Sequence, residues 1–442
     1  MKLHIFQSAH GDCLLLEGKD KKLVLCDGGM DWSMRSHVRG ELTKLRTAGR
    51  ELEYIYISHI DSDHIAGVLQ LIEDEVEWRV HDFQMTTSHP PAAPPGVPRP
   101  PVIKGLLHNA FSDQIGINQT MAVADLLAAA VPSLYATADP ALVDVGLELQ
   151  DLAVSIPEAL KISRLSASDA LDIPVNRLPG TAAPGKLLFF RNEVQSFKVG
   201  SMKFTIVGPT DQELTDLKNG WVTWLQTMKE DVRRIRRELR RRIEEFSNGV
   251  SGDSPFDLRD WNGIPDYKGV TPPNVASLMF MVEEGTGANL KRLLLTGDSH
   301  QDKVLRGLRQ TGFLADQGLH LDVLKVQHHG SENNLDADFA RHVSARNYVF
   351  CGNGLHGNPN TDVIDLIFQS RRGPAAVRAL APAADNEVFH FWFSTTSGSQ
   401  DDGTERQETF GEMEDHVEGL RQSAQGKLIV HYNEAASIEL AI

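Results

Sequence analysis

The chain has 442 residues, of which 41% are hydrophobic and 24% charged, and its formal net charge is −16. This composition is that of an ordinary soluble protein with ample material for a core. The negative charge argues against a general attraction of the surface to nucleic acid or anionic membranes, although a local basic patch is compatible with it.

Neither a signal peptide nor a membrane span is expected. The chain starts MKLHIFQSAHGD, without a long apolar run, and no later stretch approaches the length needed to span a bilayer. The three cysteines, Cys13, Cys26 and Cys351, are too few and too scattered for a disulfide framework. We therefore expect a cytoplasmic protein.

The first 90 residues predict a layered α/β arrangement, because strand patterns alternate with helix patterns. Strands are expected at residues 2–7, 14–18, 23–29, 54–58 and 78–86, and helices near 36–48 and 66–76.

Two insertions then interrupt this order. The proline-rich segment 88–101 cannot join a sheet because proline donates no ladder hydrogen bond, and the Ala/Leu-rich residues up to 180 are largely helical. The first insertion covers about 90–185, and a helical arm with a long polar loop covers about 211–273. Seven arginines fall within 233–242, which predicts either a phosphate-binding arm or the solvated face of a helix.

The remaining strand patterns complete the expected fold. They lie at residues 186–192, 203–209, 276–284, 290–298, 321–331, 345–359, 387–394, 427–433 and 437–442. We expect residues 1–370 to form the main domain and 375–442 to form a small α+β extension packed on its core.

Four polar clusters follow these strand patterns. They are Asp27, the loop 59–64 with sequence HIDSDH, Asp298, and the pair His328 and His329. Strand ends at one edge of a sheet are where α/β folds build their sites. Histidine nitrogen and aspartate oxygen suit a binuclear metal centre, in which one carboxylate can bridge two cations.

The motifs HxDxDH, DGG, TGD and HHGS, together with HGDC near the start, resemble the metallo-β-lactamase fold. The similarity is closest to the hydrolase domain of bacterial DNA-uptake channel proteins of the ComEC type, and it spans roughly residues 1–90 and 185–370. It implies a four-layer α/β/β/α sandwich with metals bound at one edge of the paired sheets.

The resemblance also implies roles for individual residues. His59 and Asp61 would bind a first metal ion, Asp63 and His64 a second, and Asp298 would bridge the two.

Three further positions have two interpretations each. His328 is favoured over His329 as an additional ligand, because it ends the strand. Asp27 would orient ligands by hydrogen bonds, or it is only an acidic residue that begins a Gly-Gly turn. His356, in GLHGNP, would bind metal or donate a proton to the leaving group.

The chain departs from the family pattern twice. Most enzymes of this fold have histidine in place of Asp61, and the added carboxylate should favour Mn²⁺ or Mg²⁺ relative to Zn²⁺. The histidine of the third motif is missing, with His89 and Asn274 as candidates to replace it. One or two divalent ions per chain are therefore expected.

These features predict a metal-dependent hydrolase that uses a metal-activated hydroxide, most plausibly a phosphodiesterase or nuclease. Asp63 or Asp298 would accept the proton of the attacking water, and Arg233, Arg237 and Arg240 would contact the phosphates of a nucleic acid. The alternatives are a hydrolase of a small lactone, thioester or amide, and a non-catalytic interaction module in a bacterial defence or stress system.

Overall fold

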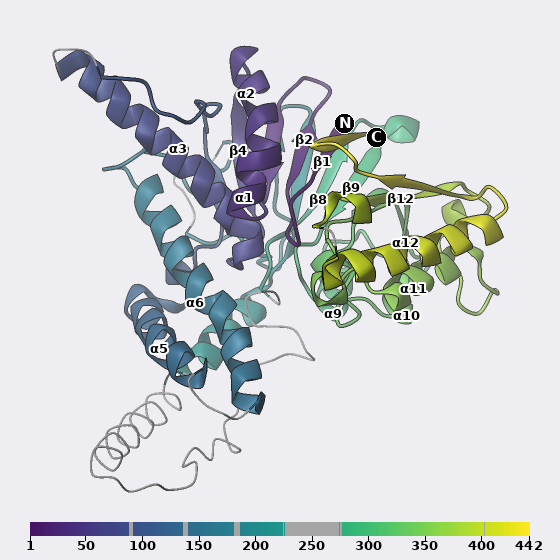
Figure 1. The fold of residues 1–442 in the computed structure, drawn as a ribbon. Coiled ribbons are helices and arrows are strands. Elements are labelled where there is room, and N and C mark those ends of the chain that lie inside the picture. The colour runs from purple at the N-terminus through teal and green to yellow at the C-terminus, as the bar shows by residue number, and fades with distance from the viewer. Residues whose placement is uncertain are drawn as a thin grey trace, which may run out of the picture.

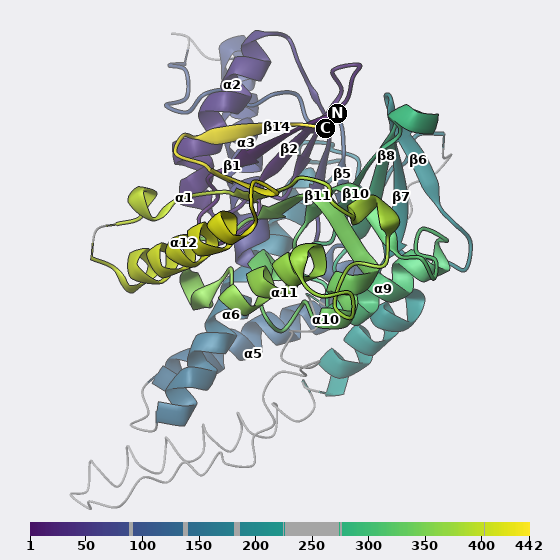
Figure 2. The ribbon, with the colours of Figure 1, turned by 90° about the vertical axis from the view of Figure 1, so that its right-hand side faces the viewer.

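Two mixed β-sheets pack face to face, and helices cover the outer face of each sheet (Figures 1 and 2). The structure is a computed structural model that describes residues 1–87, 92–135, 140–180, 186–223, 225, 274, 276–401 and 403–442. Within that part of the chain one sheet has six strands and the other has eight. The predicted α/β sandwich is confirmed.

The six-stranded sheet brings the two ends of the chain together. Its strands, in spatial order, are β14 (Ser437–Ala441), β1 (Lys2–Phe6), β2 (Leu14–Glu17), β3 (Leu23–Cys26), β4 (Leu52–Ile57) and β5 (Leu106–His108). Strand β1 is antiparallel to both β14 and β2, whereas β4 is parallel to both β3 and β5. The N and C labels are therefore adjacent in Figure 1.

The eight-stranded sheet carries the other half of the candidate site. Its strands, in spatial order, are β13 (Leu428–Tyr432), β12 (Phe389–Phe393), β11 (Val343–Phe350), β10 (Leu319–Lys325), β9 (Lys291–Leu295), β8 (Met279–Glu284), β7 (Met202–Gly208) and β6 (Ser196–Val199). Strands β9 to β13 are parallel, and β6 to β9 are antiparallel.

The helices lie on the two outer faces. Those that accompany the six-stranded sheet are α1 (Asp31–Ser33), the π-helix Met34–Val38, α2 (Arg39–Thr47), α3 (Ser62–Thr87), α4 (Phe111–Ile115), α5 (Ile117–Tyr135) and α6 (Pro140–Ser166). Those that accompany the eight-stranded sheet are α9 (Gln301–Gln310), α10 (Ala337–His342), α11 (Thr361–Arg372) and α12 (Glu405–Ser423). In Figure 2, α10, α11 and α12 lie together on the side of the second sheet.

Strand β3 shows why the fold has four layers. Its sequence LVLC is buried throughout, and neighbouring side chains point to opposite faces of a strand. Leu23 and Leu25 belong to the apolar cluster shared with the helices, whereas Val24 and Cys26 belong to the cluster between the sheets. A third apolar cluster lies between the eight-stranded sheet and its own helices.

The strand predicted at residues 78–86 is wrong, because α3 continues without a break from Ser62 to Thr87. Val76, Val80 and Phe83 are spaced four and three residues apart, which is a helical spacing, and no glycine or proline interrupts 68–87. The β-branched and aromatic residues of this stretch favoured the strand interpretation.

The strand predicted at 186–192 is also absent, apart from a single bridge between Phe190 and Thr210. The Asn109 side chain instead bonds the backbone of this segment: its Oδ1 accepts from Leu188 N, and its Nδ2 donates to Leu188 O, both at 2.7 Å. Conversely, strand β5 lies inside the largely helical region and was not predicted.

Two predictions fall on residues that the structure does not describe. The arginine-rich stretch 233–242 and His89 both lie outside the described ranges. Among the described residues, no helix is long and apolar enough to cross a membrane.

Candidate metal centre

The candidate ligands lie in loops that follow buried strands of both sheets. Asp27 follows β3, the His59–His64 loop joins β4 to α3, and Asp298 follows β9. The pair His328 and His329 follows β10, in the short 3₁₀ segment Gln327–Gly330. Because the two sheets pack face to face, these loops meet at one edge of the sandwich.

A tight backbone contact places the His59–His64 loop against the turn after β3. Gly28 N donates to His64 O, and Gly67 N donates to Gly29 O, both at 2.8 Å. A Cβ atom on Gly67 would lie only 2.0 Å from Gly28 O, so a side chain at this position would push α3 away. The glycines therefore allow the first turn of α3 to bring His64 into the centre.

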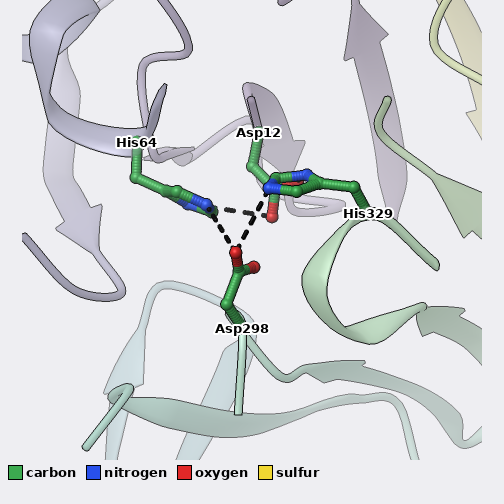
Figure 3. A group of neighbouring side chains, drawn as sticks. All are labelled: Asp12, His64, Asp298 and His329. Carbon is green, nitrogen blue, oxygen red and sulfur yellow. Dashed lines mark hydrogen bonds and ion pairs between the residues drawn. The ribbon is translucent and has the colours of Figure 1, made fainter. Parts of the chain in front are cut away.

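One carboxylate oxygen lies at the middle of the site. Asp298 Oδ2 faces the Nε2 atoms of four histidines: His64 and His329 at 3.2 Å each, His328 at 3.8 Å and His59 at 3.9 Å. Three of these imidazoles are almost fully buried, as is Asp298 itself. Figure 3 shows His64 and His329 pointing toward Asp298 from opposite sides. Asp298 is therefore the carboxylate on which the imidazoles of the site converge.

The two aspartates of the HxDxDH loop lie against different histidines. His59 Nε2 is 3.4 Å from Asp61 Oδ2, whereas His329 Nε2 is 3.0 Å from Asp63 Oδ2. The side chains thus form two groups, His59 with Asp61, and His64 with Asp63 and His329. Asp298 touches both groups.

Two carboxylates behind the centre orient two of the histidines. His64 Nδ1 lies 3.0 Å from Asp27 Oδ2, and His329 Nδ1 lies 3.1 Å from Asp12 Oδ1 and 2.6 Å from Cys351 O. An acceptor at Nδ1 places the proton there and leaves Nε2 free to bind a metal.

Asp27 takes part both in the turn after β3 and in a contact with His64. Its backbone has φ of 57°, so it does open a left-handed turn into Gly28. Its carboxylate also accepts hydrogen bonds from Ser58 N at 2.7 Å and Ser58 Oγ at 2.8 Å, which fixes the oxygen that faces His64.

We expect Asp27→Asn to weaken metal binding by about 10–100-fold without unfolding the protein, because it disturbs the partner of a ligand but not the ligand itself. A competition titration against a chromophoric chelator measures this affinity. Asp31→Asn is the control, since Asp31 lies in an exposed ion pair with Arg35. An unchanged affinity in Asp27→Asn would leave Asp27 with its turn role alone.

The carboxylates and histidines of the centre shift one another's pKa. Burial opposes charging of His64, but Asp298 and Asp63 nevertheless raise the pKa of His64 well above its ordinary value. Burial likewise disfavours a charged Asp63, yet His64 and His329 lower the pKa of Asp63 far below its usual range. The carboxylates therefore stay ionised and attract positive charge.

Two buried atoms of the centre, His59 Nε2 and Asp61 Oδ1, make no hydrogen bond among the described residues. Buried polar atoms are normally satisfied, so such a pair indicates a missing partner. Asp12, His64, Asp298 and His329 each offer a ligand atom within 4.8 Å of the others, and this group could hold a metal ion.

His328 and His329 differ in their geometry. Both have left-handed backbones, with φ of 44° and 56°, which is a strained conformation for histidine. His329 is buried against Asp63 and Asp298, whereas the His328 side chain is 25% exposed. His328 Nδ1 lies 2.7 Å from Asn334 Oδ1, and Asn334 Nδ2 donates to Asp298 O at 2.9 Å.

His356 and Asn274 lie near the centre but not within the ligand cluster. Within the described ranges no hydrogen bond or ion pair joins the His356 side chain to the carboxylates of the centre. Burial, Asp61 and Asp63 raise the pKa of Asp151 on α6 to about 6, and His356 acts in the opposite direction. Asn274 is buried, and its carbonyl accepts from Ser277 N, while Ser277 Oγ accepts from Asp298 N at 3.2 Å.

Sequence reasoning did not select Asp12 or Lys325 as part of the site. Lys325 Nζ is paired with Asp12 Oδ2 and lies 3.3 Å from Asp298 Oδ1. Both residues had a signal that could have found them. Asp12 belongs to the HGDC motif, and Lys325 is a charged residue within the apolar run LDVLKV.

The comparisons with known proteins support the fold assignment. Residues 9–77 match the model of the Metallo-beta-lactamase superfamily. No curated protein matches the chain. The matched segment contains Asp12, Asp27 and the His59–His64 loop, whereas Asp298 and His329 join them only in the folded structure. Neither comparison supports the finer resemblance to the ComEC type.

Proposed function

We propose that this protein is a metal-dependent hydrolase of phosphodiesters. The observation that carries the proposal is the convergence of four histidine Nε2 atoms on Asp298 Oδ2, flanked by Asp61 and Asp63. Two ligand groups around one carboxylate oxygen suit a pair of divalent ions. The buried atoms His59 Nε2 and Asp61 Oδ1, which make no hydrogen bond among the described residues, fit the same arrangement.

Two bound cations would supply an activated water and neutralise the charge that develops on a substrate phosphate. His59 and Asp61 would hold one cation, His64, Asp63 and His329 the other, and Asp298 both. Asp63 is the carboxylate that we propose as proton acceptor, because it is part of the centre and still 18% exposed. His356 is proposed to donate a proton to the leaving group.

The three carboxylates of the centre favour harder cations than a site with histidine in place of Asp61 would. Asp61, Asp63 and Asp298 supply three carboxylates to the centre, and oxygen-rich sites suit Mn²⁺ and Mg²⁺ better than histidine-rich sites do. Hard cations of this kind commonly serve phosphoryl chemistry. The proposed contacts of Arg233, Arg237 and Arg240 with the phosphates of a nucleic acid would also favour a phosphodiester substrate.

Replacing Asp61 with histidine should move the metal preference toward Zn²⁺, because a neutral nitrogen replaces a charged oxygen beside His59. The measurement is the affinity for Mn²⁺ and Zn²⁺ in competition titrations, together with the hydrolysis rate in each metal. Asp61→Asn is the control that removes the charge and keeps an oxygen. An unchanged ranking of the two metals in Asp61→His would mean that other ligands determine the selectivity.

The function is tested with a substrate panel on protein loaded with Mn²⁺, Mg²⁺ or Zn²⁺. The panel contains bis(p-nitrophenyl) phosphate, single- and double-stranded DNA and RNA, a lactone, a thioester and an amide. Phosphodiester cleavage that disappears in Asp298→Asn supports the proposal. Faster turnover of a carbonyl substrate would replace it with the carbonyl hydrolase, and metal binding without any turnover would favour the interaction module.

A further inference from the structure

Lys325 is a buried lysine that no step of the proposed reaction uses. It is the last residue of β10 and is only 1% exposed. Its Nζ donates to Gly297 O at 3.1 Å, lies 3.3 Å from Asp298 Oδ1, and forms a shorter contact with Asp12 Oδ2. A buried ammonium group is costly unless it is paired, and here it has two carboxylates and a carbonyl.

In Asp298 and in Asp12, one carboxylate oxygen contacts Lys325 and the other contacts a histidine. Asp298 gives Oδ1 to Lys325 and presents Oδ2 to the histidines. Asp12 gives Oδ2 to Lys325 and Oδ1 to His329 Nδ1. Because His329 Nε2 in turn lies 3.2 Å from Asp298 Oδ2, the four side chains form a closed ring.

Lys325 lies among the carboxylates of the centre, which are those of Asp12, Asp27, Asp61, Asp63 and Asp298. Among the described residues, Lys325 is the only lysine or arginine in ion-pair contact with any of them. The other ion-pair partners of these carboxylates are histidines.

Lys325 also lines a small cavity with the carboxylate that lies behind His64. The cavity has a volume of about 10 Å³ and is lined by Asp12, Asp27 and Lys325, together with Tyr56 and Cys26. Lys325 thus contacts Asp12 directly and shares this cavity with Asp27.

We propose that Lys325 is a positioning residue, the internal counter-ion that holds Asp12 and Asp298 in place before metal binds. It keeps Asp12 behind His329 and turns a single oxygen of Asp298 toward the histidines. This inference rests on the metal centre and not on the phosphodiester substrate. Its test therefore uses no substrate, and its failure can be told apart from failure of the proposed function.

The proposal predicts that bound metal ions can replace part of the positive charge of Lys325. Without Lys325 the carboxylates repel one another in the metal-free protein, whereas bound divalent cations replace part of the missing charge. If Lys325 only filled space, its replacement would lower the stability of the protein equally with and without bound metal.

The experiment compares thermal unfolding of the wild type and Lys325→Met in two states, stripped with EDTA and saturated with Mn²⁺. Methionine keeps the length of the side chain and removes its charge. Lys303→Met is the matched control, since Lys303 on α9 is 8% exposed and faces Glu213, outside the centre. Asp12→Asn and the double variant Lys325→Met with Asp12→Asn complete a cycle.

We expect Lys325→Met to lower Tm markedly in the stripped protein and much less in the Mn²⁺-saturated protein, so that the rise in Tm on adding Mn²⁺ exceeds that of the wild type. Asp12→Asn should restore Tm in the stripped double variant, because it removes the unpaired carboxylate. Lys303→Met should change Tm by the same amount in the stripped and in the Mn²⁺-saturated protein.

Equal losses of Tm in the two states of Lys325→Met would overturn the proposal. A double variant no more stable than Lys325→Met would do the same. If Lys325→Met does not fold when stripped, recovery by Mn²⁺ or by Asp12→Asn supports the proposal, and recovery by neither rejects it.

Discussion

Asp298→Asn is expected to abolish hydrolysis and to remove most of the bound metal. Asp298 Oδ2 lies 3.2 to 3.9 Å from all four histidine Nε2 atoms, so its loss removes the oxygen that faces both proposed ligand groups. The activity should fall by on the order of 10³-fold or more, because an activated water is lost with the metal. Metal analysis by plasma mass spectrometry and initial rates on the substrate that the panel identifies measure the two effects.

The fold should survive this substitution. Asparagine has the shape of aspartate, and removing one of several clustered carboxylates relieves repulsion in the metal-free protein. Asp322→Asn is the matched control, because Asp322 lies on the same sheet and pairs with Lys291, away from the centre. Full metal content in Asp298→Asn would show that Asp298 is not the bridging ligand.

His329→Asn is expected to reduce metal affinity and hydrolysis far more than His328→Asn does. His329 Nε2 lies 3.0 Å from Asp63 Oδ2 and 3.2 Å from Asp298 Oδ2, whereas His328 Nε2 is 3.8 Å from Asp298 Oδ2. Loss of a direct ligand should weaken metal binding by more than the factor of about 10–100 expected when a residue that only orients a ligand is lost. His328→Asn should fall within that smaller range.

Asparagine is the appropriate replacement at both positions, because it tolerates the left-handed backbone that these histidines adopt. The strain of the turn is then similar in the two variants, and the difference between them reports on metal binding. Metal affinity and hydrolysis rate are measured for both. A larger loss in His328→Asn would restore the interpretation in which the histidine nearest the strand is the ligand.

Much of the fold could be predicted from local pattern. Strand β3 reads as a continuous apolar run because it is buried on both faces, and the turn residues that follow it mark its end. The same reasoning failed for the second half of α3, where Val80 and Phe83 are exposed apolar residues on a helix. Local β propensity could not reveal that the helix begins in the His59–His64 loop and continues past it.

The α/β sandwich could be predicted from the sequence, as could the residue types of the candidate ligands and their order along the chain. The sequence could not determine which atoms meet, because His64 and Asp298 are 234 residues apart and are joined only by the packing of two sheets. The tertiary structure decided that His329 is closer than His328 to the central carboxylate. It also decided that Asp12 and Lys325 complete the centre, since a buried lysine is recognised by the carboxylates around it and not by its neighbours in sequence.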